Sequence, residues 1–289
     1  MGIVLGVNQY GKAESRVVRI YRDTERHEIR DLNVSTSIRG DFTDAHVTGE
    51  QTDVLPTDTQ KNTAFAFAKK YGVRSPEEYA VTLGTRLLEA TPVATGVSVR
   101  VEEYPWDRVS FGQYEHEHTF VRRGGEVRTV EVDVTHDGVG IVSGLTDMVV
   151  LKSTGSEFKD FLRDEYTTLP DADDRILATS LTAAWRHAPD TVDRIADLDW
   201  DEEHRTARGL LLEAYASTYS HALQETLYAM GRLLLERVPT IEEVSFAAPN
   251  KHHFLVDLSP FGLDNPGEVF IAADRPYGLI EATVTREAE

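Results

Sequence analysis

The first half of the chain alternates between runs of β-branched residues and stretches with helical periodicity. Short runs of Val and Ile on either side of a polar turn at residues 23–26 predict a long hairpin. Ser75, Pro76 and Glu78 predict a helix start, because serine caps free N–H groups, proline suits the first helical position and glutamate completes a capping box. Gly124-Gly125 predicts a second hairpin turn. The predicted elements are strands at 17–20 and 29–34, helices at 58–70 and 75–91, and strands at 97–101, 120–121 and 127–134.

The second half repeats this order of elements. A strand pair is followed by a helical stretch with one apolar stripe, which Val238-Pro239 ends, and strands then return. The predicted strands are 139–151, 175–185, 241–246, 254–258, 269–272 and 279–284, with helix from 201 to 237.

Both halves therefore follow the order ββααββ, although their residues are only faintly similar. This order predicts an α+β fold of two antiparallel sheets, each covered on one face by a helix pair. We place the domain boundary after residue 138, which gives domains 1–138 and 139–289.

Composition narrows the classes of function. The 289 residues include no cysteine, which excludes disulfides, thiolate nucleophiles and thiolate metal sites. The formal net charge is −19, so a nucleic-acid partner is not expected. No apolar run approaches the roughly 20 residues of a membrane span. The chain shows neither a signal peptide nor a C-terminal peroxisomal tripeptide, and we expect a cytoplasmic, bacterial protein.

Cofactor and metal motifs are weak. The chain has neither a phosphate-binding Walker loop nor a dinucleotide-binding glycine motif after a strand. His116 and His118 would share one strand face and could bind a metal, but no third ligand follows at a suitable spacing. Surface or structural histidines are the alternative, and we predict neither a metal nor an organic cofactor.

Three segments carry unusual density of polar and aromatic residues. Residues 151–169 form a connection too long for a simple turn, and its aromatic residues argue against disorder. Residues 250–253 place four polar side chains before a strand, and residues 55–63 lead into a helix whose free N–H groups favour an anion or a carbonyl oxygen.

These segments, taken in order, resemble the uricase (urate oxidase) family over nearly the whole chain. The matching residues are Tyr10-Gly11-Lys12, Thr57-Asp58, Lys61-Asn62-Thr63, Ser143-Gly144-Leu145, Leu151-Lys152-Ser153-Thr154, residues 161–169 and Asn250-Lys251-His252. The resemblance implies two tandem tunnelling-fold (T-fold) domains and a homotetramer with active sites between subunits. It also implies oxidation of urate by dioxygen and water to 5-hydroxyisourate and hydrogen peroxide, without cofactor.

The same resemblance assigns residues that bind urate. Phe158 would stack on the purine, and Arg175 and Gln224 would bind its edges, with the Leu223 backbone N–H also contributing. Leu223 stands where the family often has valine, which leaves this N–H unchanged. The residues alone allow simpler interpretations: Phe158 as a core aromatic, Arg175 in a salt bridge with Asp171, Asp173 or Asp174, and Gln224 as a solvent-facing helix residue.

The resemblance further implies a proton relay of Lys12, Thr57 and His252. Burial near a cation would lower the lysine pKa and make the neutral amine accessible as a base. Thr57 and the Asp58 backbone N–H would also contact urate, while Thr57 and Asn250 would hold dioxygen and then water above the ring. Without the resemblance, Lys12 is a solvated charge after a glycine and Thr57 only leads into a helix.

Two other functions remain compatible with the pattern. A related T-fold enzyme could handle a pterin, although such enzymes typically grip the ring with a glutamate and often carry histidine-bound zinc. A purine-binding tetramer without turnover is the third possibility, and loss of Lys12 or Thr57 would have favoured it.

Overall fold

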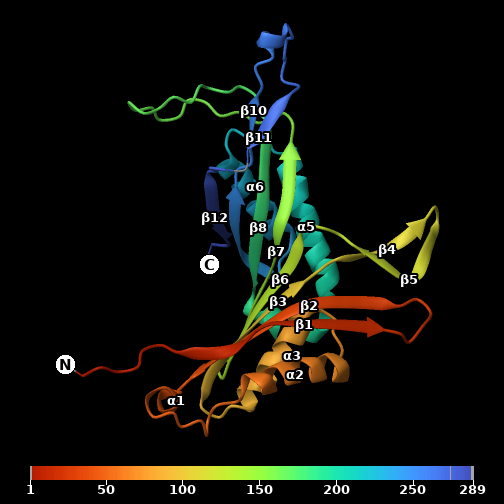
Figure 1. Cartoon of the computed structure of the whole chain (residues 1–289), viewed down its shortest axis with the longest axis vertical. Coiled ribbons are helices and arrows are strands. Elements are labelled where there is room, and N and C mark those ends of the chain that lie inside the picture. Colours follow the sequence, from red (N-terminus) through yellow and green to blue (C-terminus); the bar gives the residue numbers. More distant parts are fainter. Residues whose placement is uncertain (1, 274, 288–289) are drawn as a thin grey trace. The chain divides into compact units, whose positions relative to one another are not determined.

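Two compact units share the chain in the computed structural model, which describes residues 2–273 and 275–287 (Figure 1). The first unit runs up to Gly144 and includes Trp185–His204, and the second comprises Leu145–Ala184 and the chain from Arg205 onward. The boundary after residue 138 stays a prediction, because a compact unit does not define where a repeat of element order begins.

The first unit is built on antiparallel strands in the order β1, β2, β3 and β6, with the start of β7 (Gly138–Lys152) beside them. The predicted first hairpin is confirmed, and its strands are longer than predicted. These strands are β1 (Gln9–Tyr21), β2 (Glu28–Gly40), β3 (Ala94–Glu103) and β6 (Val127–Thr135).

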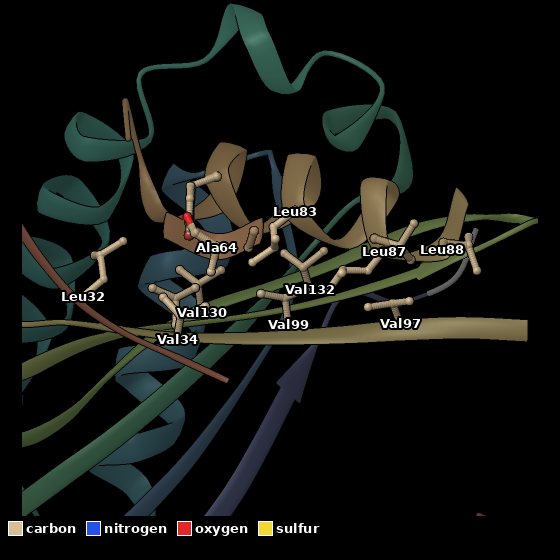
Figure 2. Close-up of a cluster of buried hydrophobic side chains, with 14 of the residues drawn as sticks. Leu32, Val34, Ala64, Leu83, Leu87, Leu88, Val97, Val99, Val130 and Val132 are labelled. Atoms are coloured by element: carbon tan, nitrogen blue, oxygen red, sulfur yellow. Dashed lines mark hydrogen bonds between the residues drawn. The ribbon is translucent and has the colours of Figure 1, made fainter. Parts of the chain in front are cut away.

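Two helices cover one face of this sheet, α2 (Thr57–Lys70) and α3 (Pro76–Glu89). Ser75 caps α3 as predicted, since its Oγ accepts a hydrogen bond from the Glu78 backbone N–H at 3.1 Å. The Glu78 carboxylate lies 3.4 Å from Arg74. Figure 2 shows the core that results, in which leucines of α3 lie against valines of β3 and β6.

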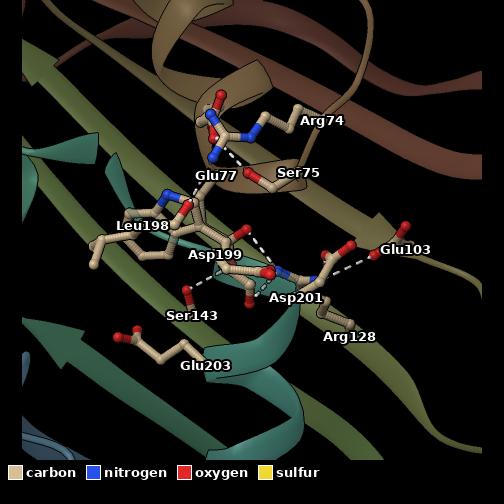
Figure 3. A network of polar contacts seen from close by, with 12 residues as sticks. Arg74, Ser75, Glu77, Glu103, Arg128, Ser143, Leu198, Asp199, Asp201 and Glu203 are labelled. Carbon is tan, nitrogen blue, oxygen red and sulfur yellow. Dashed lines mark hydrogen bonds and ion pairs between the residues drawn. The ribbon is translucent and has the colours of Figure 1, made fainter. Parts of the chain in front are cut away.

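Beside this apolar core, the first unit holds a network of charged groups (Figure 3). Arg128 is its centre, with 9% of its side chain exposed, and it contacts Glu77 and Asp201 at 2.7 Å and Glu103 at 3.3 Å. Ser143 donates a hydrogen bond to the other oxygen of Glu77 at 2.8 Å. The buried Glu77 carboxylate is thus satisfied from both sides.

The predicted hairpin at Gly124-Gly125 is wrong. β5 (Tyr114–Arg122) pairs instead with β4 (Trp106–Phe111), and the turn between them lies at Gly112, whose φ is 61°. β6 pairs with β3, because its alternating valines must be buried against the core. β5 has no buried residue and so has no such requirement.

The second unit repeats the sheet-and-helix arrangement. Its strands follow in the order β7, β8 (Leu177–His187), β9 (Ile241–Pro249) and β12 (Leu279–Thr285), and α6 (Leu223–Arg237) packs on β9 and β12. The predicted helical stretch 201–237 is a pair of helices, because the chain leaves helical conformation at 218–222 after α5 (Trp200–Ser217).

Shorter elements complete the described residues. β10 (His252–Leu255) and β11 (Phe270–Ala273) form a separate antiparallel pair, close to the predicted strands 254–258 and 269–272. Single helical turns occur at Thr43–Val47 (α1), Pro189–Val192 (α4), Ile195–Asp197 (η1) and Ser259–Phe261 (η2). Within residues 2–273 and 275–287, none of the helices has the length and apolar character needed to cross a bilayer.

Candidate functional site

A cavity of about 630 Å³ in the second unit brings together four of the predicted site residues. Phe158, Arg175, Asn250 and His252 all line it. They come from segments far apart in the sequence: the connection between β7 and β8, the end of β9 and the start of β10. The long connection noted in the sequence therefore forms a wall of this cavity.

The connection folds back on itself and so positions Phe158 and Arg175. Phe158 and Ala172 exchange backbone hydrogen bonds at 2.8 and 2.9 Å, and the Arg175 N–H donates to the Ser156 carbonyl at 2.7 Å. The Arg175 guanidinium carbon consequently lies 5.0 Å from the centre of the Phe158 ring. Phe161 stacks on Phe158 with ring centres 4.9 Å apart. Phe158 is only partly buried and faces the cavity instead of a hydrophobic core.

Arg175 has no ion-pair partner among the described residues, although three aspartates lie within four positions of it in the sequence. Its Nε is buried without a hydrogen-bond partner, and burial lowers the pKa of its guanidinium. The three aspartates are held by other groups: Asp171 by Arg163 at 2.7 Å, Asp173 by Lys159 at 3.1 Å, and Asp174 by the Thr154 hydroxyl at 2.6 Å and the Gly155 N–H at 3.0 Å. The structure therefore does not contain the salt bridge between Arg175 and a neighbouring aspartate that the residues alone allowed.

Backbone bonds fix Asn250 and His252 at the cavity wall. The Asn250 N–H donates to the Gly278 carbonyl at 2.8 Å, and Asn250 forms an isolated bridge with Thr179 of β8. His252 begins β10, opposite Ala273, and its ring stacks against Phe254 at 5.8 Å. With the backbone held in this way, both side chains are available to a ligand in the cavity.

Leu223 and Gln224 begin α6 and are not part of the cavity lining. The segment before Phe158 nevertheless pairs with the turn that leads into α6, because the Glu157 N–H donates to the carbonyl of Ser220, three residues before the helix, at 2.8 Å. Leu223 has a buried side chain and Gln224 an exposed one. The helix has no side-chain cap, and its N-terminal N–H groups favour a negatively charged ligand.

Lys12, Thr57 and Asp58 lie in the first unit. A β-bulge interrupts β1 directly after Lys12, where Glu14 has a φ of 55°. Lys61 bonds the Asp58 carboxylate and lowers its pKa, and the charge of Lys12 adds a smaller effect in the same direction. Helix α2 packs on β1, the strand that carries Lys12, and the Asp58 carboxylate is engaged within its own helix.

His116 and His118 lie side by side on β5, and the centres of their rings are 4.6 Å apart. Across the described residues, no group of three His, Cys, Asp or Glu side chains is arranged to hold a metal ion.

Sequence reasoning missed the groups that hold these residues in place. Asp174 fixes the turn beside Arg175, and the only signal was its place in a run of aspartates. Gln60 is fully buried beneath the first turn of α2, and its side chain had no distinguishing pattern.

Comparison with known proteins identifies the family. The uricase family model matches residues 8–133 and 141–281 of the chain. A uricase of Arthrobacter globiformis is 51% identical over 285 residues, covering 99% of this chain and 91% of that protein. The chain belongs to the uricase family. A uricase of Danio rerio is 36% identical, with 96% of this chain and 93% of that protein covered.

Solved uricase structures confirm the fold class. The crystal structure of the Arthrobacter globiformis uricase matches with a TM-score of 0.93 at 49% identity, covering 100% of this chain and 97% of that one. A urate oxidase of Bacillus sp. TB-90 matches with a TM-score of 0.85 at 25% identity, covering 97% of this chain and 100% of that one. The predicted α+β T-fold and the predicted uricase family are both confirmed.

Proposed function

We propose that this chain oxidises urate with dioxygen and water, giving 5-hydroxyisourate and hydrogen peroxide. The observation that carries the proposal is Arg175, a half-buried guanidinium that has no ion-pair partner among the described residues and lies over the Phe158 ring in a cavity. A desolvated cation beside an aromatic face matches a flat, electron-rich anion such as urate.

Binding of urate uses the two faces and the edges of the purine. Phe158 stacks on the ring, while Arg175 and Gln224 form in-plane hydrogen bonds to its edges. Backbone N–H groups of Leu223 and Asp58 donate to the anion. This assignment is supported by the uncapped start of α6 and by the engagement of the Asp58 carboxylate with Lys61, which leaves its backbone as the useful group.

The reaction needs a base and a place for dioxygen. Lys12 accepts a proton through the Thr57 hydroxyl, and His252 orients the lysine or a water molecule. Thr57 and Asn250 hold dioxygen above the ring and then the attacking water. Urate loses two electrons at its C5 carbon, dioxygen leaves as hydrogen peroxide, and water supplies the new hydroxyl. Since the substrate is the reductant, this chemistry requires neither a metal nor an organic cofactor.

The active molecule is proposed to be a cytoplasmic homotetramer whose sites combine residues from neighbouring subunits. The division of the predicted residues between two units supports this arrangement, since Lys12 and Thr57 belong to the first and the cavity to the second. Sedimentation of the purified protein measures the assembly, and a species smaller than a tetramer at assay concentration contradicts it.

One assay tests the proposed reaction. Urate is added to the purified protein with a metal chelator present, and urate absorbance and dioxygen concentration are followed together. We expect equal molar loss of urate and dioxygen. Absence of dioxygen uptake from neutral to alkaline pH would overturn the proposal, and uptake that the chelator abolishes would overturn its metal-free form.

A pair of variants tests the relay. Lys12→Met and Thr57→Ala should lower kcat about 100-fold or more while changing urate affinity little, because general base catalysis acts on the reaction step. Lys70→Met, at the far end of α2, is the matched control and should retain activity. Normal turnover of Lys12→Met would show that another group is the base.

A further inference from the structure

Gln60 is a polar side chain with no exposed surface, placed on the buried stripe of α2. The following positions of this stripe are Ala64 and Ala68, and an apolar residue would fit the same environment. A buried amide loses its hydrogen bonds to water, and this costs free energy unless the protein supplies hydrogen-bond partners in their place. What it bonds therefore indicates why this position carries an amide.

Both ends of the Gln60 amide have partners. Its Oε1 accepts a hydrogen bond from the Thr36 hydroxyl at 2.7 Å, and its Nε2 donates to the Leu55 carbonyl at 3.4 Å. Thr36 is itself buried in the middle of β2, with 7% of its surface exposed. The amide thus links a sheet strand to the backbone that enters α2.

These two partners are neighbours of the proposed relay. Thr36 faces Lys12 in the register of β1 and β2, and Leu55 comes two residues before Thr57. The strands approach closely at this point, since a Cβ on Gly11 would lie 1.8 Å from the Thr36 carbonyl oxygen. The antiparallel pairing of Lys12 with Thr36 holds the backbone around Lys12 against β2.

We propose that Gln60 is a positioning residue that fixes Thr57 relative to Lys12. The inference rests on the proposed relay of Lys12 and Thr57. Gln60 has no exposed surface with which to contact a ligand, so it acts through the two segments that it connects, at Thr36 and Leu55. Proton transfer depends on hydrogen-bond distance, and a displacement of about 1 Å at a reacting group can lower a rate about 100-fold.

The test separates positioning from stability with isosteric variants. Gln60→Met removes the amide, and Gln60→Met/Thr36→Val makes both partners apolar, which relieves the unpaired hydroxyl. Tyr79→Phe is the matched control, because it also removes a buried hydrogen bond. The Tyr79 hydroxyl donates at 2.8 Å to the carbonyl of Ala64, which lies on α2 like Gln60 but away from the start of that helix. For each variant, Tm, kcat and the urate KM are measured on the full-length protein.

We expect Gln60→Met to lower both Tm and kcat, with kcat reduced about tenfold or more and KM changed less than threefold. The double variant should recover Tm but not kcat, whereas Tyr79→Phe should lose Tm and keep kcat. Should Gln60→Met not fold, the double variant carries the same comparison.

Recovery of kcat together with Tm in the double variant would overturn the proposal, as would an equal loss of kcat in Tyr79→Phe. Normal turnover of Lys12→Met would instead show that the relay is misassigned, independently of Gln60. Loss of dioxygen uptake in the unmodified protein would contradict the proposed function itself.

Discussion

Arg128 and Arg175 are both withdrawn from water, and they differ in what surrounds them. Burial alone would lower the pKa of Arg128, but the carboxylates of Glu77, Glu103 and Asp201 outweigh it and raise the pKa (Figure 3). Burial lowers the pKa of Arg175, and no carboxylate pairs with it among the described residues. The same side chain is thus compensated in one unit and left uncompensated in the other.

This difference distinguishes a charge that stabilises the fold from a charge that is left to bind a ligand. Removing a cation from water costs free energy, which nearby carboxylates offset when the protein supplies them. At Arg128 the fold supplies them, so the free energy is recovered during folding. At Arg175 no carboxylate among the described residues supplies this compensation, which supports the proposal that a bound anion supplies it.

The largest effect on stability should come from removing Arg128, the arginine whose charge is compensated by carboxylates. Arg128→Met leaves the Glu77 carboxylate buried without its cation, and we expect the free energy of unfolding to fall by about 3–5 kcal/mol. Urea unfolding measures it. Arg100→Met removes the exposed Arg100–Glu131 pair of the same sheet and should cost less than about 1 kcal/mol. Equal losses in both variants would mean that burial of the pair is unimportant.

Removing Arg175, the arginine without a carboxylate partner among the described residues, should affect stability less and urate binding strongly. Arg175→Ala should weaken urate binding about ten- to a hundredfold, because hydrogen bonds to a charged group are lost. The free energy of unfolding should stay constant or rise, since no carboxylate is left without its cation. Arg232→Ala, an exposed arginine on α6, is the control. Anaerobic urate titration provides the affinities, and unchanged affinity of Arg175→Ala rules out the binding role.

The smallest effect concerns pH. Burial raises the pKa of Asp201, but hydrogen bonds from Arg30 and Arg128 outweigh it and bring the pKa below its ordinary value of 3.8. A carboxyl whose folded pKa is depressed contributes stability above the unfolded pKa, and this contribution disappears as pH falls through the folded pKa. Asp201→Asn should therefore cost about 1 kcal/mol near neutral pH and less in acid below about pH 4. A pH-independent difference would contradict this assignment.

Local signals predicted those parts of the fold that depend on neighbouring residues. Ser75 and Pro76 marked the start of α3 because capping is decided within one helical turn. Gly124-Gly125 misled, since the pairing of β6 is decided by burial against β3, a partner some thirty residues earlier in the chain.

The candidate site divides in the same way. The resemblance identified Phe158, Arg175, Asn250 and His252, which the cavity brings together. The residues alone could not decide whether Arg175 pairs with an aspartate, because this depends on how the connection folds back on itself. Gln60 escaped notice because a glutamine in a helix usually faces water, and its burial follows only from the packing of α2 on the sheet.

The close approach of β1 and β2 at Gly11 has a consequence for mutational scanning. Any side chain at this position would meet the Thr36 carbonyl oxygen, so every substitution should force the strands apart. In a library selected for activity, we expect position 11 to tolerate no substitution, as position 12 would if Lys12 is the proposed base. Activity alone would not separate the two positions. The abundance of folded protein would, because a substitution at position 11 disturbs the strands, whereas one at position 12 removes the proposed base.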